Sequence, residues 1–313
     1  MSRAATIGAL VLALSSVLGP ADAAAAEGLQ WTWDAPLRYY LEADVNYPTR
    51  ITLMAENNIQ SRVWASTTRV VTTCEPHGEP AKRTREVHCR IDDIAFAAIP
   101  QDIDAANLVT VLDETEKMLQ GAYVQLEFGY DGHIRTIDLE GFSTKNVNDR
   151  VREAQETMRV VLMRAFAALD LELPKEGKDE GKPWEQQGAL AVGFPSLRGS
   201  IGSVPVTIQV ARESGNLVTL LTRGAGVAGP GETMSTTGLP ANQYQMKLTG
   251  SATFDTTKHA LVARQYTVQG DLTPSSIMAE GGTGVPYVQK VQLRLLAPDE
   301  PAPQIGENLL VTP

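Results

Sequence analysis

Two cysteines and two histidines, Cys74, His77, His88 and Cys89, lie close together in the chain and could bind a metal ion. Thiolates and imidazoles are the ligands that zinc prefers in proteins. The alternative is a disulfide between Cys74 and Cys89, the first interpretation of a cysteine pair in an oxidising compartment. Adjacent side chains on a strand point to opposite faces, so His88 and Cys89 could share one metal only through a bulge. We therefore favour the disulfide and predict no metal site.

The polar stretch between the two cysteines, residues 75–82, carries two prolines and a glycine and has β-like sequence on either side. This composition predicts the turn of a hairpin. A disulfide across the neck of that hairpin closes a loop of roughly 15 residues, which corresponds to about 3 kcal/mol in the chain-entropy model.

A glycine-rich motif and the remaining polar residues do not predict catalysis. Residues 224–229 match the G-x-G-x-x-G pattern of nucleotide-binding loops, but a Pro-Gly pair and a loop-like run follow where that motif needs a helix. The G-x-S-x-G and H-E-x-x-H signatures of hydrolases do not occur. Three of the four histidines lie in or beside predicted hairpin turns, where side chains are mostly solvated. We expect no catalytic residues and no cofactor.

The first 26 residues predict an export signal. Arg3 is followed by an apolar run over residues 4–18, and residues 21–23 or 24–26 offer an A-x-A cleavage site. No second apolar stretch of 18 residues follows, so the sequence predicts no transmembrane span. The net charge of -10 argues against a nucleic-acid partner. We expect a protein of the periplasm or the extracellular space.

Most of the chain alternates apolar and polar residues with the period of antiparallel strands. Asp131 and Gly132 predict the tightest hairpin turn, because Asp-Gly readily adopts a positive φ. The predicted strands are Leu37–Tyr47, Arg50–Glu56, Arg62–Thr73, Glu86–Phe96, Ala122–Tyr130, His133–Leu139, Gly188–Phe194, Val204–Ala211, Asn216–Thr222, Tyr244–Phe254, Ala260–Gln269 and Val288–Leu296.

A helical period interrupts the strands between Asn148 and Leu169, and Pro174 is expected to end that helix. A shorter helix is expected over Asp113–Leu119. The long helix needs a cover for its apolar side, and the concave side of a curved sheet would provide it. The predicted fold is therefore α+β: a curved, mostly antiparallel sheet, or open half-barrel, with one long amphipathic helix packed on its concave face.

The apolar side of that helix could line a pocket for an apolar ligand or simply complete the core. The candidate lining residues are Val151, Met158, Leu162 and Phe166.

A charged, glycine-containing stretch suggests a division of the chain. The predicted units are a signal peptide (1–26), an N-terminal β-meander with the long helix (27–173), a charged linker (174–183), a C-terminal antiparallel β half (184–297) and a Pro-rich tail (298–313).

The signal peptide, the antiparallel strands and the helix together resemble the open half-barrels of the LolA and LppX lipoprotein and lipid carriers. Residues 112–114, 121–126 and 131–132 are also similar to uncharacterised secreted proteins of myxobacterial type. The first resemblance implies a lipid-carrier fold and the second implies no established activity. Neither implies a catalytic residue.

We expect an exported, non-enzymatic protein that binds or carries an apolar ligand such as a lipid. The alternative is a structural or protein-interaction module of the cell envelope, whose strands recruit a partner chain. A periplasmic hydrolase is the third hypothesis.

Overall fold

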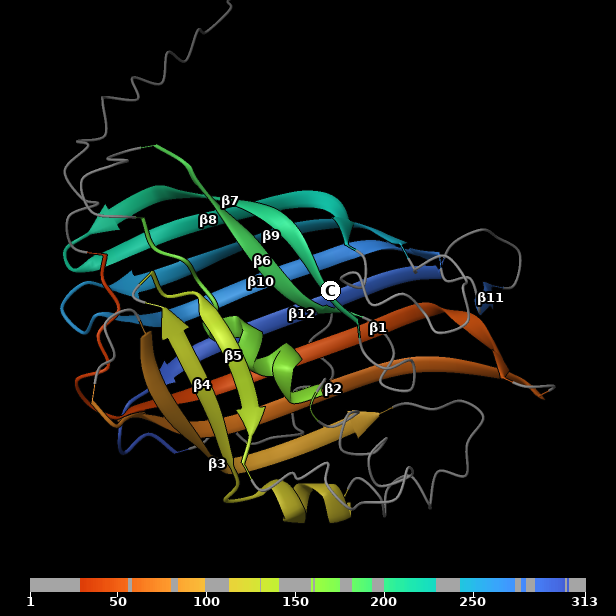
Figure 1. Ribbon diagram of the computed structural model, residues 1–313, viewed down its shortest axis with the longest axis horizontal. Helices are drawn as coiled ribbons and strands as arrows, with labels where there is room; N and C mark the ends of the chain where they lie inside the picture. The colour runs from red at the N-terminus through yellow and green to blue at the C-terminus, as the bar shows by residue number, and fades with distance from the viewer. Residues whose placement is uncertain are drawn as a thin grey trace, which may run out of the picture.

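The computed structural model describes residues 29–55, 58–79, 84–98, 113–129, 131–140, 159, 161–174, 182–192, 200–228, 243–273, 277–279, 285–301 and 303 (Figure 1). The strands are β1 (Leu37–Ala55), β2 (Asn58–His77), β3 (Thr84–Ala98), β4 (Tyr123–Gly129), β5 (Ile134–Leu139), β6 (Trp184–Val192), β7 (Ser200–Ser214), β8 (Leu217–Ala228), β9 (Gln243–Asp255), β10 (Ala260–Thr273), β11 (Ile277–Ala279) and β12 (Val285–Leu296).

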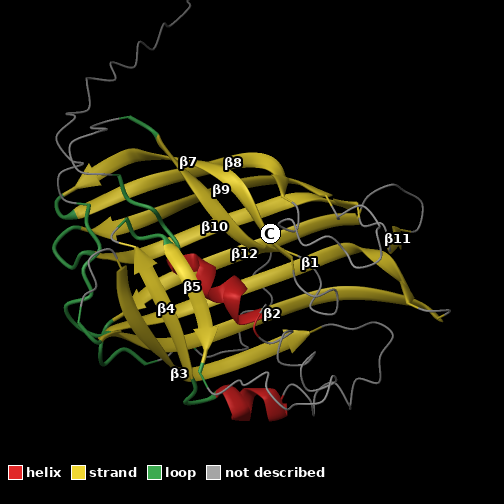
Figure 2. Cartoon of the chain, in the orientation of Figure 1, coloured by secondary structure: helices red, strands yellow, loops and turns green. Residues whose placement is uncertain are grey.

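The strands form one antiparallel sheet in the order β5-β4-β3-β2-β1-β12-β10-β9-β8-β7-β6, and β11 pairs with β1 off this path. Strands that follow one another in the chain are mostly neighbours in the sheet, as in a meander (Figure 2). The N-terminal and C-terminal runs of strands meet where β1 pairs with β12, from Arg38 opposite Leu296 to Asn46 opposite Val288. The two halves of the chain therefore share one sheet.

Side-chain alternation gives the sheet a buried face. On β1, Tyr39, Leu41 and Ala43 are buried, whereas Tyr40 and Glu42 between them are partly exposed. Residues directly opposite on neighbouring strands share a face, so the partners of Tyr39 and Leu41 on β2 and β12 lie on the same side of the sheet. We call the side that carries Tyr39 and Leu41 the inner face, and the other side the outer face.

The antiparallel, open sheet is observed, but the expected long amphipathic helix is wrong. In the described part of the predicted stretch, residues 161–166 are α-helical and a 3₁₀ turn, η2 (Ala167–Leu169), follows. Asp170 is already extended, with φ -77° and ψ 90°. The helix thus ends before Pro174. The shorter helix expected from Asp113 to Leu119 is confirmed over residues 113–119.

Tertiary hydrogen bonds fix the point at which the helix ends. The buried Arg264 of β10 donates from Nη1 to the carbonyl oxygens of Ala168, at 3.0 Å, and Asp170. These carbonyls would lack intrahelical partners at a helix end. The carboxylate of Asp170 accepts the backbone N–H of Ile134 at 2.9 Å. Bonds to distant strands therefore outweigh the local preference for helix.

The residues after the helix, Ala167–Leu173, form what we call the inner segment, which lies along the inner face. It contacts β12, β10 and β6 through η2. On β6, Trp184 Nε1 donates to the carbonyl of Glu172 at 2.9 Å, and Gln186 Oε1 accepts the N–H of Glu172 at 3.0 Å.

Both edge strands of the sheet thus bond to one segment, β5 through Ile134 and β6 through Trp184 and Gln186. The sheet must curl for its two ends to reach the same few residues. It stays open because β5 and β6 stand at opposite ends of the strand order. Figure 1 shows the helix and the inner segment in front of β12 and β1, with β4 and β5 crossing nearer the viewer. In the described ranges, no helix is both long and apolar enough to cross a membrane.

Candidate functional site

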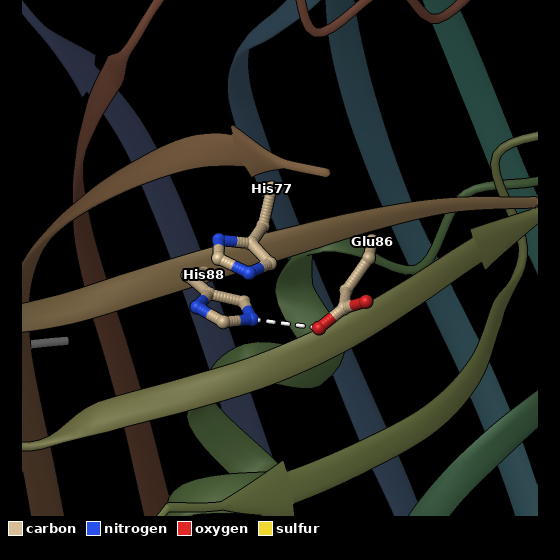
Figure 3. Close-up of side chains that lie close together, drawn as sticks. All are labelled: His77, Glu86 and His88. Carbon is tan, nitrogen blue, oxygen red and sulfur yellow. Dashed lines mark hydrogen bonds and ion pairs between the residues drawn. The ribbon is translucent and has the colours of Figure 1, made fainter. Parts of the chain in front are cut away.

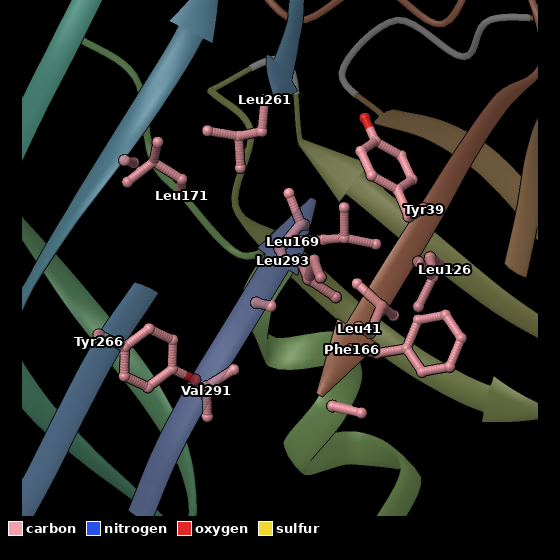
Figure 4. Packing of buried hydrophobic residues seen from close by; sticks show 14 of the residues in the cluster. Tyr39, Leu41, Leu126, Phe166, Leu169, Leu171, Leu261, Tyr266, Val291 and Leu293 are labelled. Carbon is pink, nitrogen blue, oxygen red and sulfur yellow. The ribbon is translucent and has the colours of Figure 1, made fainter. Parts of the chain in front are cut away.

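The inner face carries one continuous apolar cluster that spans both halves of the sheet. Figure 4 shows its centre, where Phe166 and Leu169 of the helical segment lie among side chains of β1, β4, β10 and β12. Fully buried members include Tyr39, Leu41, Leu126, Ile208, Leu220, Phe254 and Leu261. These side chains pack against one another and form the hydrophobic core of the sheet.

Two of the four predicted ligand-lining residues lie in this cluster. Leu162 and Phe166 are 2% and 0% exposed, so both pack against other side chains. Val151 and Met158 lie outside the described residues.

An aromatic group extends the cluster at the start of the chain's described part. Trp31 stacks on Trp33 with ring centroids 5.5 Å apart, and it meets Phe254 of β9 edge-on at 5.7 Å. Its Nε1 donates to the carbonyl of Leu171 at 3.2 Å. The residues before β1 therefore help hold the inner segment. Trp31 and Trp33 are both buried and belong to the core.

A buried polar group lies beside this apolar surface. His133 Nδ1 lies 2.9 Å from Asp170 Oδ1, and this hydrogen bond raises the pKa of His133 against the opposing effect of burial. Burial lowers the pKa of Arg264, whose guanidinium lies over the Tyr266 ring at 5.1 Å. These residues fix the inner segment to the turn between β4 and β5 and to β10. Their geometry indicates a structural tether between strands.

Among the described residues, several buried polar atoms have no hydrogen-bond partner, and Tyr39 Oη, Trp33 Nε1 and Thr222 Oγ1 are three of them in or beside the apolar cluster. Tyr39 lies on β1, and Thr222 lies on β8, where it pairs with Ile208 and Gly250 on the same face. Burial raises the pKa of Tyr39, so its hydroxyl stays a neutral donor. Native interiors rarely leave such groups unpaired, because each costs about 1–3 kcal/mol.

The Cys74–Cys89 disulfide is confirmed. The two residues are directly opposite each other on β2 and β3, and both are fully buried on the inner face. Because their sulfur atoms are bonded to each other, a zinc site that uses these cysteines is wrong.

Within the described ranges, one set of metal-ligating side chains does gather: His77, Glu86 and His88, on the outer face of the same hairpin (Figure 3). Sequence reasoning missed this set because it grouped His88 with its neighbour Cys89, which points to the other side. The usable signal was the two-residue spacing of Glu86 and His88, which puts both side chains on one face.

Comparisons with known proteins assign no family to this chain. No known protein family and no curated protein matches the sequence. Nine chains among the solved structures match. One is a structure described as "Lipid-protein interactions in lipovitellin", with 12% identity and a TM-score of 0.43 over 86% of this chain and 26% of that one. This chain thus spans about a quarter of that protein. No family or curated protein supports the similarity of residues 112–114, 121–126 and 131–132 to secreted myxobacterial-type proteins.

Proposed function

We propose that the protein is an exported, non-enzymatic binding protein that holds an apolar ligand, such as a lipid, against the inner face of its sheet. The observation that carries this proposal is the presence of two buried hydroxyls without a hydrogen-bond partner, Tyr39 and Thr222, on a mostly apolar face of an open sheet. An amphiphile suits both the apolar face and the two hydroxyls. Its chain replaces water on the apolar face, and its polar group accepts a hydrogen bond from a hydroxyl.

Export is supported by the disulfide, because such bonds persist in oxidising compartments. The predicted signal peptide itself lies outside the described residues. The intact mass of the protein from the periplasmic or extracellular fraction tests this part. A mass that corresponds to cleavage after Ala23 or Ala26 supports export, and an unprocessed chain in the cytoplasm contradicts it.

The binding proposal is tested first without any variant. Native mass spectrometry after gentle extraction should find a co-purifying lipid, and delipidated protein should take up a fluorescent fatty acid. Protein that carries no lipid and takes up no fatty acid contradicts the proposal.

A Tyr39→Phe variant tests the role of the unpaired hydroxyl. The change keeps the ring and removes an unsatisfied polar atom, so the ligand-free protein should be at least as stable as the wild type. Fatty-acid affinity should fall by roughly 3- to 10-fold, the value of one net hydrogen bond. Tyr40→Phe is the matched control, because Tyr40 directly follows Tyr39 on β1, lies on the outer face and donates to Glu42. It should leave the fatty-acid affinity unchanged.

The second candidate function is a protein-interaction module of the cell envelope. It is favoured by the open sheet, whose edge strands β5 and β6 end the strand order and could add a strand from a partner. A stoichiometric partner captured from envelope extract by lipid-free protein would support it over lipid binding.

A further inference from the structure

A pair of histidines and a glutamate lie together where the β2–β3 hairpin approaches its turn (Figure 3). His77 is the last residue of β2 and is directly opposite Glu86 on β3. His88 follows two residues later on β3, so its side chain points to the same face as that of Glu86. Strand pairing, and not a flexible loop, therefore positions all three side chains.

These three side chains are within reach of one another. The two imidazole rings are stacked, with centroids 3.8 Å apart and planes 7° from parallel. His88 Nε2 lies 2.7 Å from Glu86 Oε1, and one ligand atom from each residue lies within 4.8 Å of the others. Ligand atoms at about 2.0–2.1 Å from a tetrahedral metal are about 3.3 Å apart. Rotation of the exposed His77 and Glu86 side chains can close the remaining distance.

The surroundings favour a cation. Glu75 is opposite His88 on β2, and Glu127 is opposite Glu86 on β4. Both residues share the outer face with the histidines, so three carboxylates lie on this patch around two imidazoles. Arg90, two residues after His88 on the same face, is paired with Asp92 at 2.9 Å. This charge distribution attracts a positive ion and repels an anion.

The disulfide pre-organises the site from the other side of the sheet. Cys74 lies three residues before His77, and Cys89 directly follows His88. The covalent link fixes the pairing of β2 with β3, and this pairing in turn fixes the separation of His77 and His88. A ligand set held in place before binding loses less entropy when the metal arrives.

We propose that His77, Glu86 and His88 bind one divalent transition-metal cation of the zinc class. Two imidazoles and one carboxylate suit zinc, copper and nickel. Three protein ligands leave a fourth tetrahedral position for water. The site lies on the outer face, so it is independent of ligand binding on the inner face.

Calorimetric titration of the tag-free, full-length mature protein with zinc chloride tests the proposal. One zinc ion should bind per chain, and the thermal midpoint should rise with zinc concentration. His77→Asn and His88→Asn should each weaken zinc binding by about tenfold or more, the scale on which losses around metal sites act. With copper(II) as the probe, electron paramagnetic resonance should show nitrogen coupling that each variant reduces.

His259→Asn is the matched control. It removes one imidazole from the turn between β9 and β10, and asparagine tolerates the positive φ of 49° there. The control should bind zinc as the wild type does. The proposal is overturned if wild-type protein binds no zinc, or if zinc and copper bind equally well to the control and to both cluster variants. Circular dichroism of each variant separates loss of binding from loss of folding.

Discussion

His133 connects a partly exposed turn to a buried carboxylate, and its ionisation is therefore linked to folding. The hydrogen bond to Asp170 raises its pKa above the ordinary value of 6.5. The turn itself depends on Gly132, which has a φ of +82° and whose Cβ, if added, would lie 2.1 Å from Trp31 Nε1. The Asp-Gly turn expected from the sequence thus places His133 within reach of Asp170.

The stabilisation from His133 should depend on pH. A pKa that is higher in the folded than in the unfolded state favours folding fully below pH 6.5. The contribution is lost as the pH rises through the folded-state pKa. Urea unfolding should give a higher free energy of unfolding for the wild type than for His133→Gln. This difference should be larger at about pH 6 than at about pH 8.5, two values on either side of the imidazole titration. Equal differences at both pH values would contradict the linkage.

The Cys74–Cys89 disulfide joins β2 to β3 covalently. Cys74→Ala combined with Cys89→Ala should lower the free energy of unfolding by about 3 kcal/mol, since the bridge closes a separation of 15 residues. Denaturant unfolding of oxidised wild type and double variant measures this change. In the wild type, both thiols should resist alkylation until a reductant is added. A loss below about 1 kcal/mol would show that the bridge constrains the unfolded chain less than the entropy model requires.

At the scale of elements, the inner segment joins parts of the sheet that are distant in sequence. It receives bonds from Trp31, Ile134, Trp184 and Arg264. None of these contacts is local, so the segment's conformation depends on the sheet around it. The segment in turn keeps the two edges of the sheet near each other.

Replacement of Arg264 by methionine should destabilise the protein by about 2–5 kcal/mol, because the carbonyls of Ala168 and Asp170 would stay buried without their donor. Hydrogen exchange should accelerate first in the inner segment. Arg223→Met, on the exposed side of β8, is the control and should change stability by less than about 0.5 kcal/mol. Equal effects of the two variants would show that the guanidinium does not support the segment.

At the scale of the whole molecule, the seam between β1 and β12 joins the two runs of strands. The pairing covers nine residue pairs, and side chains from both sides of it belong to one apolar cluster. The division into units at 27–173 and 184–297 stays a proposal, which unfolding experiments can test.

The mature protein should unfold in one cooperative transition, because separation of the halves would expose the cluster and break the seam together. Tryptophan fluorescence and far-ultraviolet circular dichroism should give coincident denaturation curves. Leu293→Ala on β12 should shift both curves equally. The free energy of unfolding should fall by about 2–5 kcal/mol, as for other buried leucines. Two separated transitions would instead support independent halves.

Much of the sheet could be predicted because strand formation follows local rules. The two-residue alternation of Tyr39, Leu41 and Ala43 marks the buried side of β1, and Asp131-Gly132 marks a turn. The pairing of Cys74 with Cys89 followed from a hairpin that closes within a short stretch. The candidate site was predicted less well. Leu162 and Phe166 are buried, and their contact with a ligand is still a proposal.

The sequence by itself determined most of the strands, the hairpin disulfide and the helix at 113–119, because each depends on residues near one another in the chain. It did not predict β11, and the predicted strands Leu37–Tyr47 and Arg50–Glu56 are one strand, β1. Only the tertiary structure decided where the helix at 161–166 ends and how the sheet curls. It also decided that His77, Glu86 and His88 gather. The helix ends where Arg264, 94 residues away from Asp170, binds its carbonyl oxygen. Local periodicity carries no information about a hydrogen bond over that separation. It also does not say which residues of two strands lie opposite each other, because that depends on the pairing register.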